Sequence, residues 1–208
     1  GNFSFARNKP LEEYNLEQMR DEILKANSCI EQELGIQPKT FAYPCGQKFV
    51  GRSKDVRSYV PLVAEYFLVG RDAFNEVPND PTFTDLAQVT ALDMDDVTFE
   101  TVQQYLDYAR KYNSWLIFLG HEISHQGKQT VNISVLEKLC QFLKDGDIWV
   151  DTVEKIGTYI TSAVSQVERG SYPYVQIKFS SSNNIYKVVT KALPQEKFSS
   201  ALNQGKTI

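Results

Sequence analysis

Histidine and cysteine are scarce in this sequence of 208 residues. The three cysteines (Cys29, Cys45 and Cys140) are widely separated and odd in number, which excludes a disulfide scaffold. There are two histidines, His121 and His125, so a histidine-rich metal site built by this chain alone must use them. No stretch approaches the ~18–20 apolar residues that span a bilayer, and the first residues do not have the pattern of a signal peptide.

Positive charge is also in short supply. The chain carries 22 basic against 26 acidic side chains, a net charge of -4 at pH 7, and no run of lysine or arginine is visible. We therefore expect neither nucleic acid nor an anionic membrane surface as the main partner. The remaining composition, 42% hydrophobic and 23% charged, is that of an ordinary soluble globular protein with one core and room for a small appendage.

Segments with helical periodicity alternate with short apolar segments. The first helix is predicted over residues 16–34, because apolar side chains recur there at steps of three and four after a capping box of Asn15 and Gln18. Ser134 and Glu137 form a second capping box. Further helices are predicted over residues 58–65, 99–111, 134–146 and 153–164. Strands are predicted over residues 40–43, 66–70, 86–92, 115–119 and 148–150. This alternation is typical of βα units, so we expect an α/β fold with a parallel sheet.

The pattern changes near the C-terminus. Residues 174–179 and 185–190 are predicted as the strands of a β-hairpin, followed by a polar tail. We therefore divide the chain into an α/β domain, residues 1–168, and a hairpin appendage with tail, residues 169–208. About five strands precede the hairpin, fewer than the eight βα units of a closed barrel, so the domain is expected to be a partial (β/α) barrel or an open sheet.

Polar side chains gather where the predicted strands end. Tyr43–Cys45, Gly70–Asp72, Asp93–Asp95, His121 and Asp151 all follow apolar strands. Because the carboxyl ends of parallel strands meet at one edge of a sheet, these residues mark the expected site.

The stretch His121–His125 also matches the H-E-x-x-H pattern of zinc proteases. That chemistry needs a helix that places both histidines on one face. Here the pattern follows an apolar strand and Gly120, and Gly127 comes two residues after it. The extended protease pattern would need glycine and histidine where Lys128 and Val131 stand, so we do not favour a protease.

The order and spacing of the strand-end motifs are similar to those of one enzyme family. Pro38–Gly46 (PKTFAYPCG) looks like a strand-end motif with an aromatic residue, proline and glycine. Leu92–Asp96 (LDMDD) stands where an aspartate motif follows, and Leu119–His121 (LGH) looks like an L-x-H motif. Ile148–Val150, followed by a helix, is similar to a closing strand and helix. Over about Leu11–Tyr159 the chain resembles the polysaccharide deacetylase (NodB-homology, carbohydrate esterase family 4) domain.

The resemblance implies a hydrolase that removes N- or O-acetyl groups from a polysaccharide or oligosaccharide with the help of a divalent metal, usually zinc. By position, His121 would be the general acid that protonates the leaving amine. Asp95 or Asp93 would orient His121 and favour its charged form. The Cys45 amide would face the oxyanion and Tyr43 would line the sugar groove. The substrate-binding residues implied by the strand-end motif are Tyr43, Pro44, Cys45 and Gly46.

The family's metal ligands are not found in this sequence. Residues 1–34 contain no histidine, and Ala42 stands where the family has an arginine. We therefore expect an N-terminally incomplete domain without metal ligands of its own. The alternative is a non-catalytic descendant of the deacetylase fold that binds a glycan or a partner protein. Exposed sheet edges of an incomplete barrel would favour a homo-oligomer that completes the sheet. The resemblance implies an extracytoplasmic (periplasmic or secreted) bacterial protein.

Simpler interpretations stand beside these roles. Asp93, Asp95 and Asp96 could form a turn or cap the next helix. His121 could be a strand-end histidine satisfied by a carboxylate, and Cys45 a small buried residue.

Overall fold

The computed structural model describes residues 11–73, 77–144, 146, 148–169, 176–178 and 187–189, and side chains up to residue 163. Helices and strands are mixed, as the sequence pattern predicts. The helices are α1 Leu16–Leu34, α2 Val60–Tyr66, α3 Phe99–Tyr112, α4 Ile133–Lys144 and α5 Val153–Arg169. Short 3-10 helices are η1 Leu11–Glu13, η2 Pro44–Gly46, η3 Ser53–Asp55 and η4 Leu86–Gln88. The strands are β1 Thr40–Ala42, β2 Phe49–Val50, β3 Arg57–Ser58, β4 Val69–Arg71, β5 Leu92–Asp93, β6 Phe118–Leu119, β7 Glu122–Ser124, β8 Thr130–Asn132, β9 Gln176–Lys178 and β10 Lys187–Val189.

Short parallel pairings connect β1 to β6 through the middle of the molecule. β1 pairs with β4, and β5 pairs with β6, both in parallel. Between these pairs, Arg71 forms a parallel bridge with Val89, which precedes β5. Within the described residues this series of strands is open and does not close into a barrel. The α/β class is therefore established, with an open arrangement of parallel strands at its centre.

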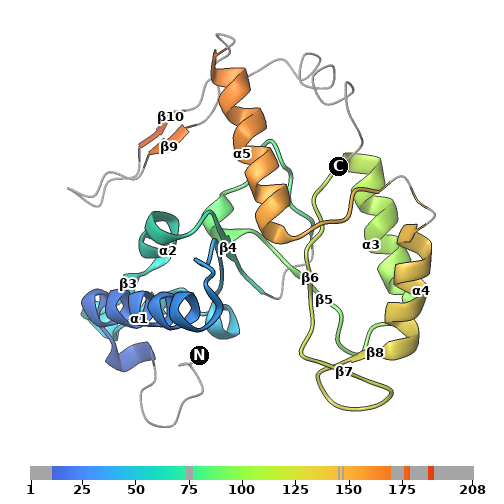
Figure 1. Ribbon diagram of the computed structural model, residues 1–208, viewed down its shortest axis with the longest axis horizontal. Coiled ribbons are helices and arrows are strands. Elements are labelled where there is room, and N and C mark those ends of the chain that lie inside the picture. Colours follow the sequence, from blue (N-terminus) through green and yellow to red (C-terminus); the bar gives the residue numbers. More distant parts are fainter. Residues whose placement is uncertain are drawn as a thin grey trace.

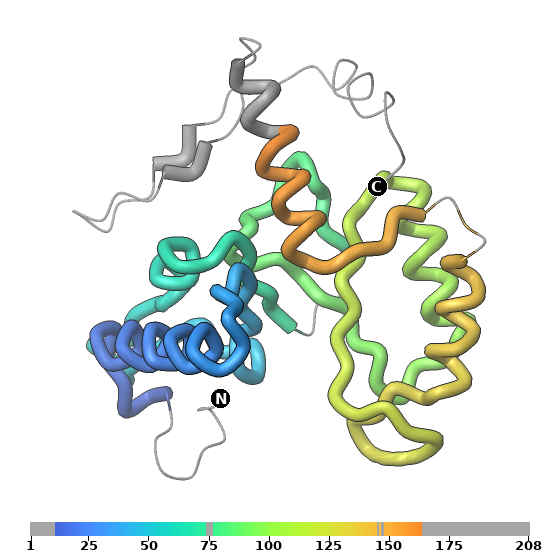
Figure 2. Tube along the Cα trace, in the orientation of Figure 1, coloured from blue at the N-terminus to red at the C-terminus, as the bar shows by residue number. Residues whose placement is uncertain are grey.

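Three groups of buried side chains surround these strands. The first joins α1 and α2 to β1, the second joins α5 to the central strands, and the third lies between α3 and α4. Figure 1 shows α1 and α2 on one side of the central strands, α3 and α4 on the other, and α5 between them at the top. The trace in Figure 2 follows α3 and α4 side by side. The core is thus divided among the helices rather than gathered in one barrel interior.

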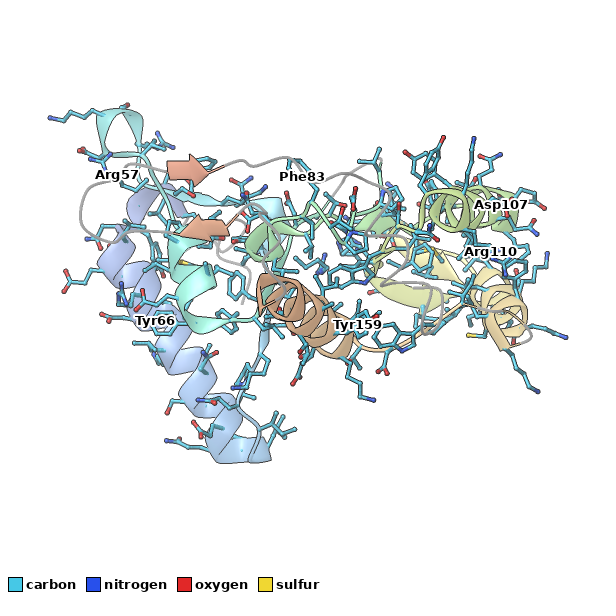
Figure 3. All side chains as sticks on the ribbon, turned by 90° about the horizontal axis from the view of Figure 1, so that it is seen from above. Arg57, Tyr66, Phe83, Asp107, Arg110 and Tyr159 are labelled. Carbon is cyan, nitrogen blue, oxygen red and sulfur yellow. The ribbon has the colours of Figure 1, made fainter. Side chains whose placement is uncertain are left out.

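Helix α1 begins where the sequence predicts. The side chain of Asn15 accepts a hydrogen bond from the Gln18 amide and the Gln18 side chain accepts one from the Asn15 amide, which completes the capping box. Arg20 holds α1 against α2 through Glu65, at 2.8 Å, and through the hydroxyl of Tyr66. Figure 3 shows Tyr66 beside α1. The helix is therefore anchored along one flank near its beginning.

Three predicted elements differ from the structure. Residues 86–92 are not one strand, because Leu86–Gln88 forms η4 and only Leu92 of this range belongs to β5. Residues 148–150 form no strand, and they line a cavity of about 330 Å³ together with residues 114–118 and others. A strand needs a hydrogen-bonding neighbour, and this segment has none among the described residues. Helix α4 begins at Ile133 rather than at Ser134, since the Asn132 side chain accepts the Ser134 amide at 2.9 Å.

The predicted C-terminal strands pair with each other. β9 and β10 are antiparallel, with Lys178 opposite Lys187. The tail and the other parts of residues 170–208 lie outside the described residues. No helix in the described part of the chain is long and apolar enough to cross a membrane.

Candidate functional site

An aspartate and a histidine meet at the ends of β5 and β6. The parallel register places Asp93 opposite Leu119, so Asp95 and His121, each two residues further, emerge side by side. Asp95 Oδ2 lies 2.5 Å from His121 Nδ1, and the His121 amide donates to Asp95 Oδ1 at 3.1 Å. The Asp95 side chain is 6% exposed and that of His121 is 42% exposed. A nearly buried carboxylate thus holds a half-exposed imidazole.

Asp93, the other aspartate named from the sequence, bonds to the backbone that carries Asp95. Asp93 Oδ1 accepts the Asp95 amide at 2.9 Å, which fixes the backbone that carries Asp95. The chain then turns at Asp96, whose φ is 55° and whose amide donates to the Thr130 carbonyl at 3.0 Å. Of the two aspartates named from the sequence, Asp95 contacts His121 and Asp93 shapes the turn. The turn interpretation applies to Asp93 and Asp96, and a role of Asp95 in a site stays a prediction.

A glycine allows the histidine to approach. A Cβ atom on Gly120 would lie 2.3 Å from Val131 Cγ2 and 3.5 Å from Asp95 Oδ1. The first distance is far below any normal contact, so a side chain at this position would push β8 or the His121 loop away. Gly120 therefore sets the spacing between the Asp95 carboxylate and the His121 backbone.

The hydrogen bonds determine which nitrogen of His121 can act. An ionised carboxylate can only accept, so Nδ1 is the donor to Asp95 and carries a proton in both the neutral and the charged imidazole. The neutral ring then has a free lone pair on Nε2, and the charged ring has an Nε2 proton to give. Because the ring is 42% exposed, Nε2 can reach a bound molecule. This pair can transfer a proton in either direction.

The other strand-end motif lies elsewhere. Tyr43 is 3% exposed, and its hydroxyl donates to the Ala87 carbonyl at 2.7 Å. Its ring packs against Phe41 and Tyr59, and burial raises its pKa above the ordinary value for tyrosine. The structure thus directs Tyr43 into the core, while Cys45, with φ 52°, lies half-buried in the turn that follows. The remaining motif residues, Pro44 and Gly46, complete that turn.

The stagger of the strands separates the two motifs. The Asp72 amide donates to the Val89 carbonyl, so the end of β4 lies level with Val89. Asp93 is four residues further along, roughly 13 Å at ~3.3 Å per residue. At the β4 end, Lys48 Nζ lies 2.5 Å from Asp72 Oδ2, a pair the sequence does not indicate because Lys48 follows an irregular turn. Strand-end residues therefore form two clusters, and Asp95 with His121 is one of them.

The H-E-x-x-H stretch is not helical. Glu122–Ser124 is strand β7, so His121 and His125 do not share a helix face. The His125 carbonyl accepts from the Asn132 side chain at 3.2 Å, and the residue is exposed in the loop beyond β7. Among the described residues there is no group of three or more His, Cys, Asp and Glu side chains that could hold a metal ion. Asp151 accepts the Thr152 amide and pairs with Lys155 at the start of α5.

No protein family, curated protein or solved structure matches this chain.

Proposed function

We propose that the chain is a polysaccharide-deacetylase-like domain, a partial (β/α) barrel whose His121 serves as general acid in the hydrolysis of N- or O-acetyl groups on glycans. The observation that carries the proposal is the Asp95–His121 pair at the ends of adjacent parallel strands. It coincides with the aspartate and L-x-H positions on which the family resemblance rests. The extracytoplasmic location that the family implies stays a prediction.

The chemistry of the pair suits the departure of an amine. An amide C–N bond breaks readily only when its nitrogen receives a proton as the bond lengthens. His121 donates that proton from Nε2, and Asp95 accepts from Nδ1 and stabilises the charged ring before the transfer. The second bond, from the His121 amide to Asp95 Oδ1, prevents the ring and backbone from swinging away. Proton transfer by a positioned group contributes about 10²–10⁴-fold to a rate.

A divalent metal does not fit the described residues. No three suitable ligands gather among them, and the Nδ1 atom of His121 is committed to Asp95. We therefore assign no step through a metal, and the proposed role of this chain is limited to proton transfer and positioning.

The alternative is a non-catalytic descendant that binds a glycan or a partner protein. One observation favours it: the side chains at the ends of β1 and β4 are engaged in contacts within the chain. Tyr43 is bonded to the Ala87 carbonyl and Lys48 is paired with Asp72, so these side chains are not directed toward a substrate.

Acetate release from acetylated chitooligosaccharides, measured beside elemental analysis of the same purified protein, tests the proposal. The deacetylase role predicts acetate above the rate in buffer. Saturable binding of the oligosaccharide without acetate release would instead support the alternative. If the chain neither releases acetate nor binds the oligosaccharide, the deacetylase role and the glycan-binding form of the alternative are both contradicted.

A further inference from the structure

Strand β1 has a second edge that no described residue covers. The Lys39 carbonyl accepts from Leu68 at 2.8 Å and the Tyr43 amide donates to Arg71 at 3.0 Å. Because backbone groups alternate along a strand, the N–H and C=O groups of Thr40 and Ala42 face away from β4. Both residues are exposed, and their backbone groups form no hydrogen bond to a turn or loop in the described part of the chain. An edge of this kind can accept another strand.

An apolar groove of about 310 Å³ lies between this edge and α1. It is lined by Met19, Glu22, Ile23, Lys25, Ala26, Cys29, Phe41, Ala42 and Pro44. The apolar stripe predicted for the first helix continues past the groove without cover, since Ile30 is 38% and Leu34 is 67% exposed. Burying such a stripe is favourable because apolar surface leaves water. The groove, the strand edge and the stripe together form one surface, which we call the β1 surface.

We propose that the β1 surface joins two copies of this chain, with β1 antiparallel to β1 of the second copy. The outward N–H groups of Thr40 and Ala42 determine the register of this pairing. When Phe41 of one chain lies opposite Phe41 of the second, Thr40 of each chain lies opposite Ala42 of the other. In each of these Thr40–Ala42 pairs, each residue donates its N–H to the C=O of the other. Pro38 and Pro44, which flank β1 on its two sides, lack an N–H, so pairing cannot extend beyond this short edge. The arrangement therefore closes as a dimer and does not grow into a fibre.

The charges on the groove favour a second copy over an unrelated strand. Glu22 and Lys25, one helical turn apart on α1, both line the groove, and neither forms an ion pair within the described part of the chain. In a two-fold symmetric dimer the same surface of each copy forms the interface. A charged residue of one copy can therefore face a residue of opposite charge from the other copy. A rim that carries both signs is complementary to itself, whereas a rim of one sign would repel.

Sedimentation velocity of the whole chain over a range of concentrations tests this proposal. We expect a monomer–dimer equilibrium. Ala42→Pro removes an outward donor without touching the β4 side and should weaken the dimer at least about tenfold. The matched Ala42→Val keeps the N–H and should dimerise like the wild type. A wild-type chain that stays monomeric, or an Ala42→Pro variant that dimerises unchanged, would overturn the proposal.

A charge exchange gives a second test that does not alter the backbone. Glu22→Lys alone or Lys25→Glu alone leaves one sign on the rim and should weaken the dimer. The double variant E22K/K25E should restore it, because the two signs are present again in exchanged places. Equal association of all these variants would contradict the proposed facing of the two copies.

Discussion

Asp95 and His121 are joined by two hydrogen bonds although 26 residues separate them in the chain. One bond holds the ring and the other holds the backbone, so a single carboxylate fixes both parts of the histidine. The parallel register of β5 and β6 produces this contact, and Gly120 leaves the room for it. The geometry would survive a change of substrate, since it is built from the strands themselves.

Replacing the Asp95 carboxylate should affect both the activity and the stability of the protein, and the two effects can be measured separately. Asp95→Asn removes the negative charge and so the stabilisation of the charged ring, and we expect acetate release to fall at least about tenfold. The free energy of unfolding should fall by about 1–3 kcal/mol, because Asp95 is nearly buried and both of its bonds are affected. Acetate assays and urea unfolding measure the two effects. Asp96→Asn, at an exposed position where asparagine tolerates the positive φ, is the control. Similar losses in both variants would count against the assignment.

Gly120→Ala should destabilise the fold by about 1–3 kcal/mol, the usual cost of overpacking. The added methyl group would meet Val131 Cγ2 at 2.3 Å. The double variant G120A/V131A removes the opposing methyl groups and should be more stable than the sum of the single changes predicts. A double-mutant cycle in urea measures this coupling. Strict additivity of the two changes would show that the close approach does not exist.

Asn79→Ala should destabilise the chain although it removes few atoms. The buried Asn79 side chain accepts the Thr90 amide at 2.7 Å and donates to the carbonyls of Thr90 and Trp115. Its loss leaves buried backbone groups unpaired, at about 1–3 kcal/mol. Asn113→Ala, at the exposed end of α3, loses only the preference of asparagine for a positive φ and should cost less. Thermal unfolding of both variants compares them, and an equal loss would contradict the role of Asn79.

The stability of the fold should decline in alkaline solution. Burial raises the pKa of Tyr43 and of Tyr59 in the folded state, so each keeps its proton after an unfolded tyrosine, with a pKa of about 10, has lost it. Their contribution is complete below pH ~10 and is lost as the pH rises toward the folded values, by up to about 1.4 kcal/mol per pH unit for each tyrosine. Urea unfolding between pH ~9 and ~11 should show this slope. Tyr43→Phe should make the slope shallower; an unchanged slope would contradict the assignment.

The sequence predicts the local elements well where short-range chemistry decides them. Asn15 and Gln18 cap α1, short apolar runs locate β1 and β4, and helical spacing of apolar residues locates α3, because capping and burial depend on neighbouring residues. Helix α4 is capped by Asn132 rather than Ser134. Both side chains are able to cap a helix, and the geometry of the turn before α4 determines which of them does so.

Long-range features are less accessible to prediction. The proximity of Asp95 and His121 follows from strand order and spacing, but the separation of Tyr43 from them depends on stagger, which no local pattern encodes. Lys48 and Asp72 meet through an irregular turn. The 148–150 segment has strand-like composition, yet a strand forms only where a neighbour supplies hydrogen bonds.

The comparison of the two histidines is the most direct test of the central claim. Acetate release from acetylated chitooligosaccharides is measured for the wild type, for His121→Gln and for His125→Gln under identical conditions. A general acid at His121 predicts that His121→Gln lowers the rate at least about 100-fold while His125→Gln leaves it unchanged. Equal rates in the two variants, or a loss confined to His125→Gln, would contradict the account.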